Sequence, residues 1–172
     1  MNGEREARWV PLAEVARPHG VRGELRLQLF NAESDFLLGV DEVLVRFKKG
    51  EAHEVSVDAA RRADKTILLK LHSVDDRDRA EELRGAEICV RRSDFPPLED
   101  GEFYACDVEG AEVRLQNARI GKVERYVEYP AAYVLLVRKD DGSSLEVPLT
   151  DAYVAKLDAD AGVVELSSIE DL

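Results

Sequence analysis

The sequence predicts a mainly β protein with two domains, each a barrel or a sandwich, and one short helix in the N-terminal half. Short segments of alternating apolar and polar residues recur at regular spacing along the 172 residues, which is typical of small all-β domains. A Pro-Pro pair followed by Asp-Gly interrupts this pattern within residues 94–101. We therefore expect an N-terminal domain over residues 1–95, a linker over 96–101 and a C-terminal domain over 102–172.

The first predicted strand pair flanks a tight turn at residues 17–23. Pro18 fixes its own backbone φ angle, and Gly20 and Gly23 can adopt positive φ values at little steric cost. Leucines alternate with polar residues over 24–29, which is the period of a strand buried on one face. The apolar residues within 9–15 favour the preceding strand.

Further strands are expected over residues 43–47, 54–60 and 66–72, with an exposed basic connection at 61–65. Ser73 opens the predicted helix, because acidic residues follow it in the first turn and Gly85 provides a C-terminal stop. Ala80 and Leu83 supply its narrow apolar stripe, and residues 86–90 return to a strand.

In the C-terminal half, strands are expected over residues 112–115, 119–129, 133–138, 145–148 and 163–166. The segment Asp140-Asp141-Gly142 predicts a hairpin turn. Four tyrosines lie on or beside these strands, and we interpret them as packing residues of the β domain: Tyr126, Tyr129, Tyr133 and Tyr153.

Composition restricts the class of protein. The apolar fraction of 45% is ordinary for a globular chain, whereas the charged fraction of 35% exceeds the usual value of about 25%. No apolar run approaches the roughly 20 residues of a membrane span, and residues 1–8 lack the apolar segment of a secretory signal. Cys89 and Cys106 have no metal-type spacing. We expect a cytoplasmic protein with both thiols reduced; a disulfide between them is the less favoured alternative.

The net charge of −12 is distributed unevenly. Residues 1–95 hold 17 Lys and Arg against 19 Asp and Glu, a net charge of −2, whereas residues 96–172 hold 7 against 17, a net charge of −10. The C-terminal half should therefore repel nucleic acid and attract a basic partner. An acidic surface that serves only to keep the protein soluble explains this charge equally well.

Several segments resemble the RimM family of bacterial ribosome maturation factors. The opening segment Arg17-Pro18-His19-Gly20-Val21-Arg22-Gly23-Glu24-Leu25-Arg26-Leu27 is similar to that family's N-terminal signature. In the C-terminal half, residues 102–110 resemble the aromatic-pair motif that opens its second domain, and residues 121–123, 134–137 and 147–149 follow in the family's order. The resemblance spans nearly the whole chain.

This resemblance implies a fold and a function. The fold would be an N-terminal six-stranded barrel like those of translation factors, followed by a C-terminal PRC-type barrel. The function would be that of a non-enzymatic assembly factor, which binds the immature small (30S) ribosomal subunit and promotes maturation of its head and 16S rRNA processing. The C-terminal domain would dock ribosomal protein S19, which agrees with the charge distribution because ribosomal proteins are typically basic.

Two groups of residues are candidates for contacts with such partners. Arg17, His19 and Arg22 could contact ribosomal RNA phosphates from the first turn, although the glycines and the proline could equally shape that turn around solvated side chains. Phe103 and Tyr104 are candidate partner-binding aromatics. Strand alternation favours Tyr104 as a packing residue and Phe103 as the more exposed of the two.

The sequence provides no basis for predicting an active site, a metal site or a cofactor. His19, His53 and His72 are scattered, and neither a phosphate-binding nor a dinucleotide-binding glycine motif is present. The alternatives are a stand-alone RNA-binding module, which the net charge of −12 disfavours, and a barrel-fold enzyme, which needs a polar pocket that the sequence does not indicate. We expect a monomer that does not associate with a membrane.

Overall fold

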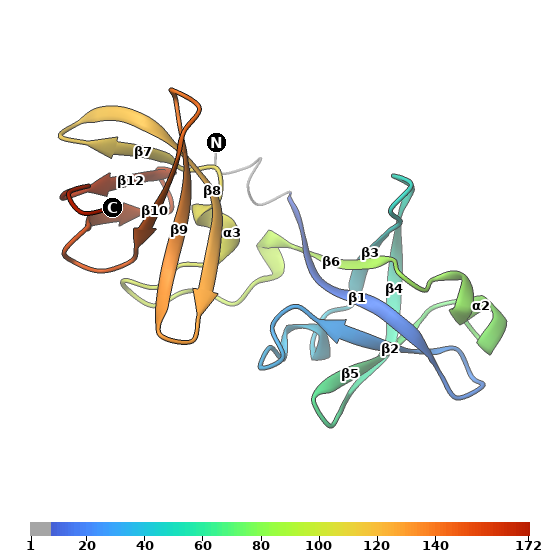
Figure 1. The fold of residues 1–172 in the computed structure, drawn as a ribbon. Coiled ribbons are helices and arrows are strands. Elements are labelled where there is room, and N and C mark those ends of the chain that lie inside the picture. Colours follow the sequence, from blue (N-terminus) through green and yellow to red (C-terminus); the bar gives the residue numbers. More distant parts are fainter. Residues whose placement is uncertain (1–7) are drawn as a thin grey trace. The chain divides into compact units, whose positions relative to one another are not determined.

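The computed structural model describes residues 8–172, which form two compact units (Figure 1). The first unit ends at Pro96 and the second begins at Pro97. Residues 1–7, which the first predicted domain includes, lie outside the described part. Both units consist mainly of strands, so the predicted fold class is confirmed.

The first unit is a closed six-stranded barrel with the strand order β1-β2-β5-β4-β3-β6. Every neighbouring pair in it is antiparallel. Its strands are β1 (Trp9–His19), β2 (Glu24–Leu29), β3 (Glu42–Arg46), β4 (Ala52–Ala63), β5 (Thr66–Leu71) and β6 (Glu87–Arg91). Two short 3-10 helices, η1 (Phe36–Leu38) and η2 (Arg92–Asp94), and one α-helix, α2 (Arg77–Glu82), complete the unit.

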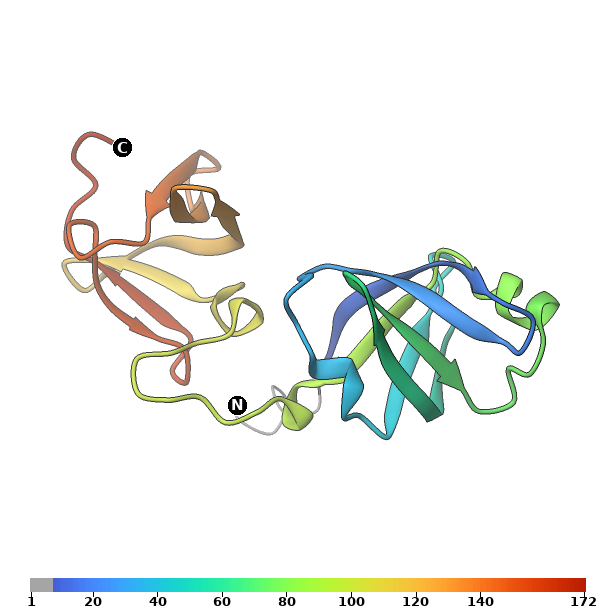
Figure 2. The same ribbon diagram turned by 90° about the horizontal axis from the view of Figure 1, so that it is seen from below.

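The barrel interior holds one cluster of aliphatic side chains supplied by alternate positions of all but one of the strands. Its largest fully buried members are Val15, Leu25, Leu37, Val43, Val45, Ile67, Leu69, Leu71, Ile88 and Val90. Burial of one such side chain contributes about 1.5–3 kcal/mol. Ala80 of α2 belongs to the same cluster, so the helix covers one end of the barrel, as Figure 2 shows.

The turn between β1 and β2 adopts the conformation that its glycines predict. Gly20 has φ +66° and Gly23 has φ +89°. A Cβ atom at Gly23 would lie 2.0 Å from the carbonyl oxygen of Val74, so only glycine lets the turn approach the segment before α2. Arg77 of α2 then donates a hydrogen bond to the Gly20 carbonyl at 3.0 Å, which fixes the turn from the helix side.

The predicted start of the helix was wrong by three residues. Ser73 has φ +64° and belongs to a turn, and Asp76 caps the helix by accepting a hydrogen bond from the Arg79 N–H at 2.8 Å. Asp76 has the extended backbone that an N-cap requires, whereas the positive φ of Ser73 excludes it from that role. The predicted stop at Gly85 is consistent with its φ of +80°.

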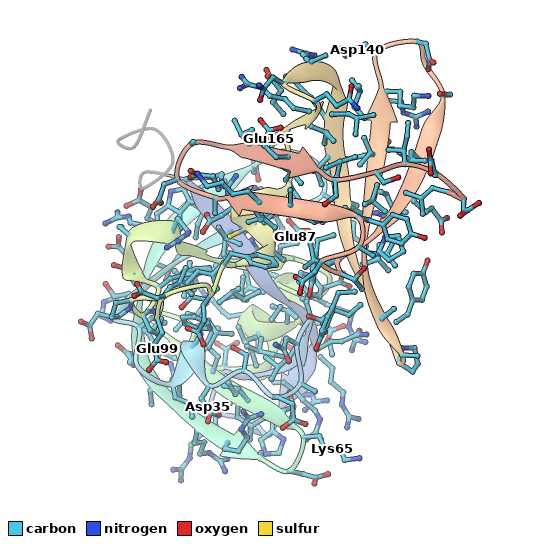
Figure 3. All side chains as sticks on the ribbon, turned by 90° about the vertical axis from the view of Figure 1, so that its left-hand side faces the viewer. Asp35, Lys65, Glu87, Glu99, Asp140 and Glu165 are labelled. Atoms are coloured by element: carbon cyan, nitrogen blue, oxygen red, sulfur yellow. The ribbon has the colours of Figure 1, made fainter. Side chains whose placement is uncertain are left out.

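The basic connection expected at residues 61–65 is mostly strand. β4 continues to Ala63, and a turn at Asp64 and Lys65 leads into β5; Figure 3 shows Lys65 at this turn. Arg62 has a structural role there, because it donates hydrogen bonds to the carbonyls of Ala32 and Ser34 and pairs with the Asp35 carboxylate. Because β4 extends to Ala63, Arg62 lies in a strand and binds the loop that follows β2.

The second unit is a six-stranded sheet with the order β10-β9-β8-β7-β12-β11. The pair β12–β7 is parallel, and the others are antiparallel. Its elements are α3 (Ala105–Val108), β7 (Glu112–Leu115), β8 (Ala118–Tyr129), β9 (Ala132–Lys139), β10 (Ser144–Pro148), β11 (Val154–Asp158) and β12 (Val163–Leu166). Strand β11 and helix α3 were absent from the sequence-based prediction.

The core of the second unit is built mainly of valines. Its fully buried members include Val108, Val113, Leu135, Val137 and Val147, and Gly121 is buried where β8 approaches β9. A Cβ atom at Gly121 would lie 2.2 Å from the Arg138 carbonyl oxygen. Glycine therefore permits the close pairing of these two strands.

The interpretation of all four tyrosines as packing residues was wrong for two of them. Tyr126 and Tyr153 pack against the core of the second unit, whereas Tyr129 is 48% exposed and Tyr133 is 53% exposed. Both exposed rings lie near the end of the long β8–β9 hairpin, which extends past the other strands of its sheet in Figure 1. The end of the hairpin lies beyond the buried core of the second unit, so its side chains are exposed.

The two cysteines are free thiols, Cys89 buried in the barrel wall and Cys106 half-buried in α3. Burial raises the pKa of the Cys89 thiol, which keeps it protonated. Among residues 8–172, no helix is both long enough and apolar enough to span a membrane.

Candidate interaction surfaces

The three basic residues of the first turn lie together at one end of β1 and β2. Arg17 and Arg22 are exposed and His19 is half-buried, while Pro18 between them is buried. The strand register sets His19 opposite Glu24 and Arg17 opposite Arg26. The structure therefore brings the predicted basic residues to one accessible surface, here called the basic turn (Arg17, His19 and Arg22).

Charges around the basic turn are incompletely paired. Arg61 forms an ion pair with Glu24 at 3.1 Å, and it is the main cause of the lowered pKa of the Glu24 carboxyl, to which His19 and Arg22 also contribute. Within residues 8–172, neither Arg17 nor Arg26 has an ion-pair partner, although like charges directly opposite on paired strands repel. An anion such as a phosphate would relieve this repulsion.

Phe103 and Tyr104 precede α3, and both are half-buried. Phe103 is partly exposed as expected, but it also packs against the core of the second unit. Its ring meets Tyr126 edge to face at a centroid distance of 5.9 Å and an interplanar angle of 84°. Both side chains are half-buried, so the structure does not single out one of them as the exposed residue.

Tyr126 connects Phe103 to a third ring. It stacks on Tyr133 with centroids 5.9 Å apart and an interplanar angle of 16°. The Tyr126 hydroxyl donates a hydrogen bond to the Glu128 carboxylate at 3.4 Å, and the Tyr126 backbone N–H donates one to Glu109 at 3.3 Å. Burial, and then the Glu128 charge, raise the pKa of Tyr126 to about 12, so the phenol stays neutral.

The remaining surface of the second unit is dominated by carboxylates. Most of its seven Lys and Arg residues are ion-paired within the unit: Arg114 with Glu112, Arg119 with Asp140, Arg138 with Glu124, Lys139 with Asp141 and Lys156 with Asp158. Figure 3 shows Asp140 and Glu165 on this sheet. Because the basic residues are largely neutralised, the surplus acidic charge remains available to an outside partner.

In the described part of the chain, no group of three or more His, Cys, Asp and Glu side chains is arranged to hold a metal ion. His72 lies 3.4 Å from the carboxylate of Asp58, and its side chain is 69% exposed. Such an exposed pair lacks the burial that tunes catalytic groups.

Sequence reasoning missed the stacked rings of Tyr126 and Tyr133. The available signal was the hairpin register, because a two-residue turn at Pro130 and Ala131 sets Tyr133 opposite Glu128 and diagonal to Tyr126. Predicting that register requires placing the two-residue turn at Pro130 and Ala131, since the pairing of Tyr129 with Ala132 follows from it.

Comparison with known proteins connects both units to one family. The chain matches the family model described as the RimM N-terminal domain over residues 10–95 and the RimM PRC barrel domain over residues 104–172. The ribosome maturation factor RimM of Sorangium cellulosum is 48% identical over 168 residues, which cover 97% of this chain and 99% of that protein. The corresponding protein of Thiobacillus denitrificans is 36% identical and covers 98% of this chain and 87% of its own length.

A solved structure gives a similar alignment along the whole chain. The crystal structure of a RimM protein from Pseudomonas aeruginosa, described as a 16S ribosomal RNA processing protein, has 27% identity and a TM-score of 0.48. The alignment covers 96% of this chain and 100% of that one.

Proposed function

The chain belongs to the RimM family of ribosome maturation factors, and from this premise we propose that it is a non-enzymatic assembly factor for the small ribosomal subunit. It binds the immature 30S subunit through ribosomal protein S19 and promotes maturation of the subunit head and 16S rRNA processing. It acts as a monomer in the cytoplasm and needs no cofactor. Stabilising one conformation of the immature subunit requires only differential binding.

The observation that carries this proposal is the concentration of acidic charge in the second unit. Residues 96–172 hold a net charge of −10, and most of the basic side chains there are already ion-paired. A basic ribosomal protein complements such a surface, which accelerates encounter and sets orientation. Phe103 and Tyr104 would contribute aromatic contacts to this interface.

The first unit would contact rRNA through the basic turn. Arg17 and Arg22 are exposed, and a planar guanidinium suits phosphate oxygens. The rigid attachment of the turn to α2, through Gly23 and Arg77, keeps these side chains in a defined position. RNA contact by this unit would complement the protein contact made by the second.

The monomer proposal is supported by the edge strands of the second unit. β10 ends at Pro148, and β11 carries Lys156 at its centre. Proline and lysine on edge strands discourage pairing with another sheet. The first unit has a closed barrel and therefore presents no edge strand to pair.

The proposal is tested by titrating the full chain against purified S19, immature 30S subunits and mature 30S subunits. We expect binding to S19 and to the immature subunit, with affinity for the mature subunit at least tenfold weaker, about 1.4 kcal/mol. Binding to none of the three by a correctly folded chain would contradict the function. Equal binding to naked rRNA without protein would favour the stand-alone RNA-binding alternative.

A further inference from the structure

The β8–β9 hairpin carries aromatic and acidic side chains on one of its faces. Tyr126 lies opposite Leu135 and Glu128 lies opposite Tyr133, and these four residues share the face that continues from the core. Leu135 is fully buried, Tyr126 is half-buried and Tyr133 is 53% exposed. Side chains on this face of the hairpin are therefore buried at Leu135, and they become exposed toward Tyr133.

Two carboxylates contact Tyr126, one at its hydroxyl and one at its backbone. Glu128 accepts the Tyr126 hydroxyl at 3.4 Å, and Glu109 accepts the Tyr126 backbone N–H at 3.3 Å. Both glutamates are exposed. The combination places negative charge at the rim of a stacked aromatic pair, which is an arrangement that favours a cation over the ring face.

We propose that Tyr126, Tyr133, Glu109 and Glu128 form a surface that receives an arginine side chain of a basic polypeptide partner. The inference rests on the proposed function, in which the second unit binds a basic ribosomal protein, and it specifies where and how that protein is held. The guanidinium stacks on the exposed Tyr133 ring, and the neighbouring carboxylates accept its N–H groups.

Charge decides between a polypeptide and an RNA occupant. Stacked tyrosines also accept nucleobases, but a single strand brings phosphates that need a basic groove around the rings. Here Glu109 and Glu128 both contact Tyr126, and Arg138 is ion-paired with Glu124 at 3.1 Å. Arg125 is exposed beside Tyr126 in β8, but strand alternation places it on the opposite face. The acidic surroundings repel a phosphate backbone and attract a basic polypeptide.

The hairpin supplies a matched control for the experiment. Tyr129 is 48% exposed, close to the value for Tyr133, but strand alternation places it on the opposite face from Glu128. Tyr133→Ala and Tyr129→Ala therefore remove the same side chain from the same hairpin at similar exposure. Tyr133→Phe keeps the stacked ring and removes only the hydroxyl.

The test measures the affinity of the full chain for labelled S19. We expect Tyr133→Ala to weaken binding about tenfold, whereas Tyr129→Ala and Tyr133→Phe stay within about twofold. Glu128→Gln should weaken binding about threefold and reduce its salt dependence. Circular dichroism of each variant verifies the fold.

Arginine and lysine peptides test the surface independently of S19. An oligo-arginine peptide should bind the wild-type chain more tightly than an oligo-lysine peptide of equal length, and Tyr133→Ala should remove the preference. If the wild-type chain does not bind S19, the proposed function is contradicted. The peptide measurements then test by themselves whether the surface of Tyr126 and Tyr133 binds arginine.

Three results would overturn the inference. The first is S19 binding that Tyr133→Ala leaves unchanged, and the second is a larger loss from Tyr129→Ala than from Tyr133→Ala. The third is binding of a single-stranded RNA oligonucleotide that depends on Tyr133 while neither basic peptide does, because the rings would then serve as a base-stacking platform.

Discussion

In the first unit the sheet closes on itself and every strand has two hydrogen-bonded neighbours, whereas in the second unit β10 and β11 lie at the ends of the strand order. The closed barrel buries most of its large apolar side chains, although Val21 and Phe30 are exposed beside the ends of β2, and it exposes charged residues such as Arg17 and Arg22 at a turn. The second unit lets the β8–β9 hairpin extend beyond its core, and this exposes Tyr129 and Tyr133. The contrast shows how two β units in one chain can offer a partner different chemistry.

Both units depend on a glycine where two segments approach closely, and the larger effect is expected in the first. Gly23→Ala should lower the free energy of unfolding by at least about 3 kcal/mol, because φ is +89° and the added Cβ would lie 2.0 Å from the Val74 oxygen. Gly20→Ala is the matched control, since φ is +66° but nothing lies within 4 Å, and it should cost about 1 kcal/mol. Urea denaturation of both variants measures the difference, and equal losses would contradict the close approach.

In the second unit, Gly121→Ala should cost about 2 kcal/mol. Its Cβ would lie 2.2 Å from the Arg138 oxygen, which must shift, but its φ is not in the left-handed region. Gly39→Ala combines an ordinary φ of −117° with open space and should change stability by less than about 0.5 kcal/mol. A Gly121 variant as stable as the wild type would show that β8 and β9 tolerate separation at this point.

The helices of the two units also differ. α2 has a side-chain cap at Asp76, whereas the N-cap residue of α3, Tyr104, makes no capping hydrogen bond with its side chain. Asp76→Ala should therefore reduce stability by about 1 kcal/mol. Asp75→Ala, which removes an exposed ion pair with Lys70, should cost less than about 0.5 kcal/mol. Thermal unfolding distinguishes the two, and a larger effect at Asp75 would contradict the capping role of its neighbour.

The effect confined to the narrowest range of conditions is the late ionisation of Tyr126, which changes stability only at alkaline pH. Its pKa of about 12 lies above the ordinary value of 10.0, so the unfolded chain loses this proton first as the pH rises. Tyr126 therefore favours the folded state below pH 10, and this contribution declines between about pH 10 and pH 12. The phenolate absorption of the wild type minus that of Tyr126→Phe should titrate near pH 12. A midpoint near 10 would show that Tyr126 is neither desolvated nor close to Glu128.

The parts of the fold that the sequence predicted are those where a local signal is strong. Leucine alternation identified β2, and the positive φ values of Gly20 and Gly23 agree with the predicted turn. Strand β11 was missed because its apolar residues, Val154, Ala155 and Leu157, do not alternate with polar ones, since a bulge shifts the pairing between Val154 and Lys156. The helix start was misplaced because Ser73 and Asp76 offer equivalent capping chemistry, and only backbone geometry distinguishes them.

The candidate sites also divide into one that the local sequence revealed and one that it did not. The basic turn is contiguous in sequence, so its residues could be grouped before the structure was known. The stack of Tyr126 and Tyr133 depends on the cross-strand register of β8 and β9, which is not visible in the local sequence. The net charge of the second unit is visible in composition, but the internal pairing of most of its basic residues is not.

The most direct test of the central claim is the salt dependence of the affinity between the full chain and purified S19. If the acidic second unit holds a basic ribosomal protein, binding should be tight at low ionic strength and should weaken at least about tenfold as salt screens the interface. Tight binding that is independent of salt, or no binding at any ionic strength, would contradict the claim.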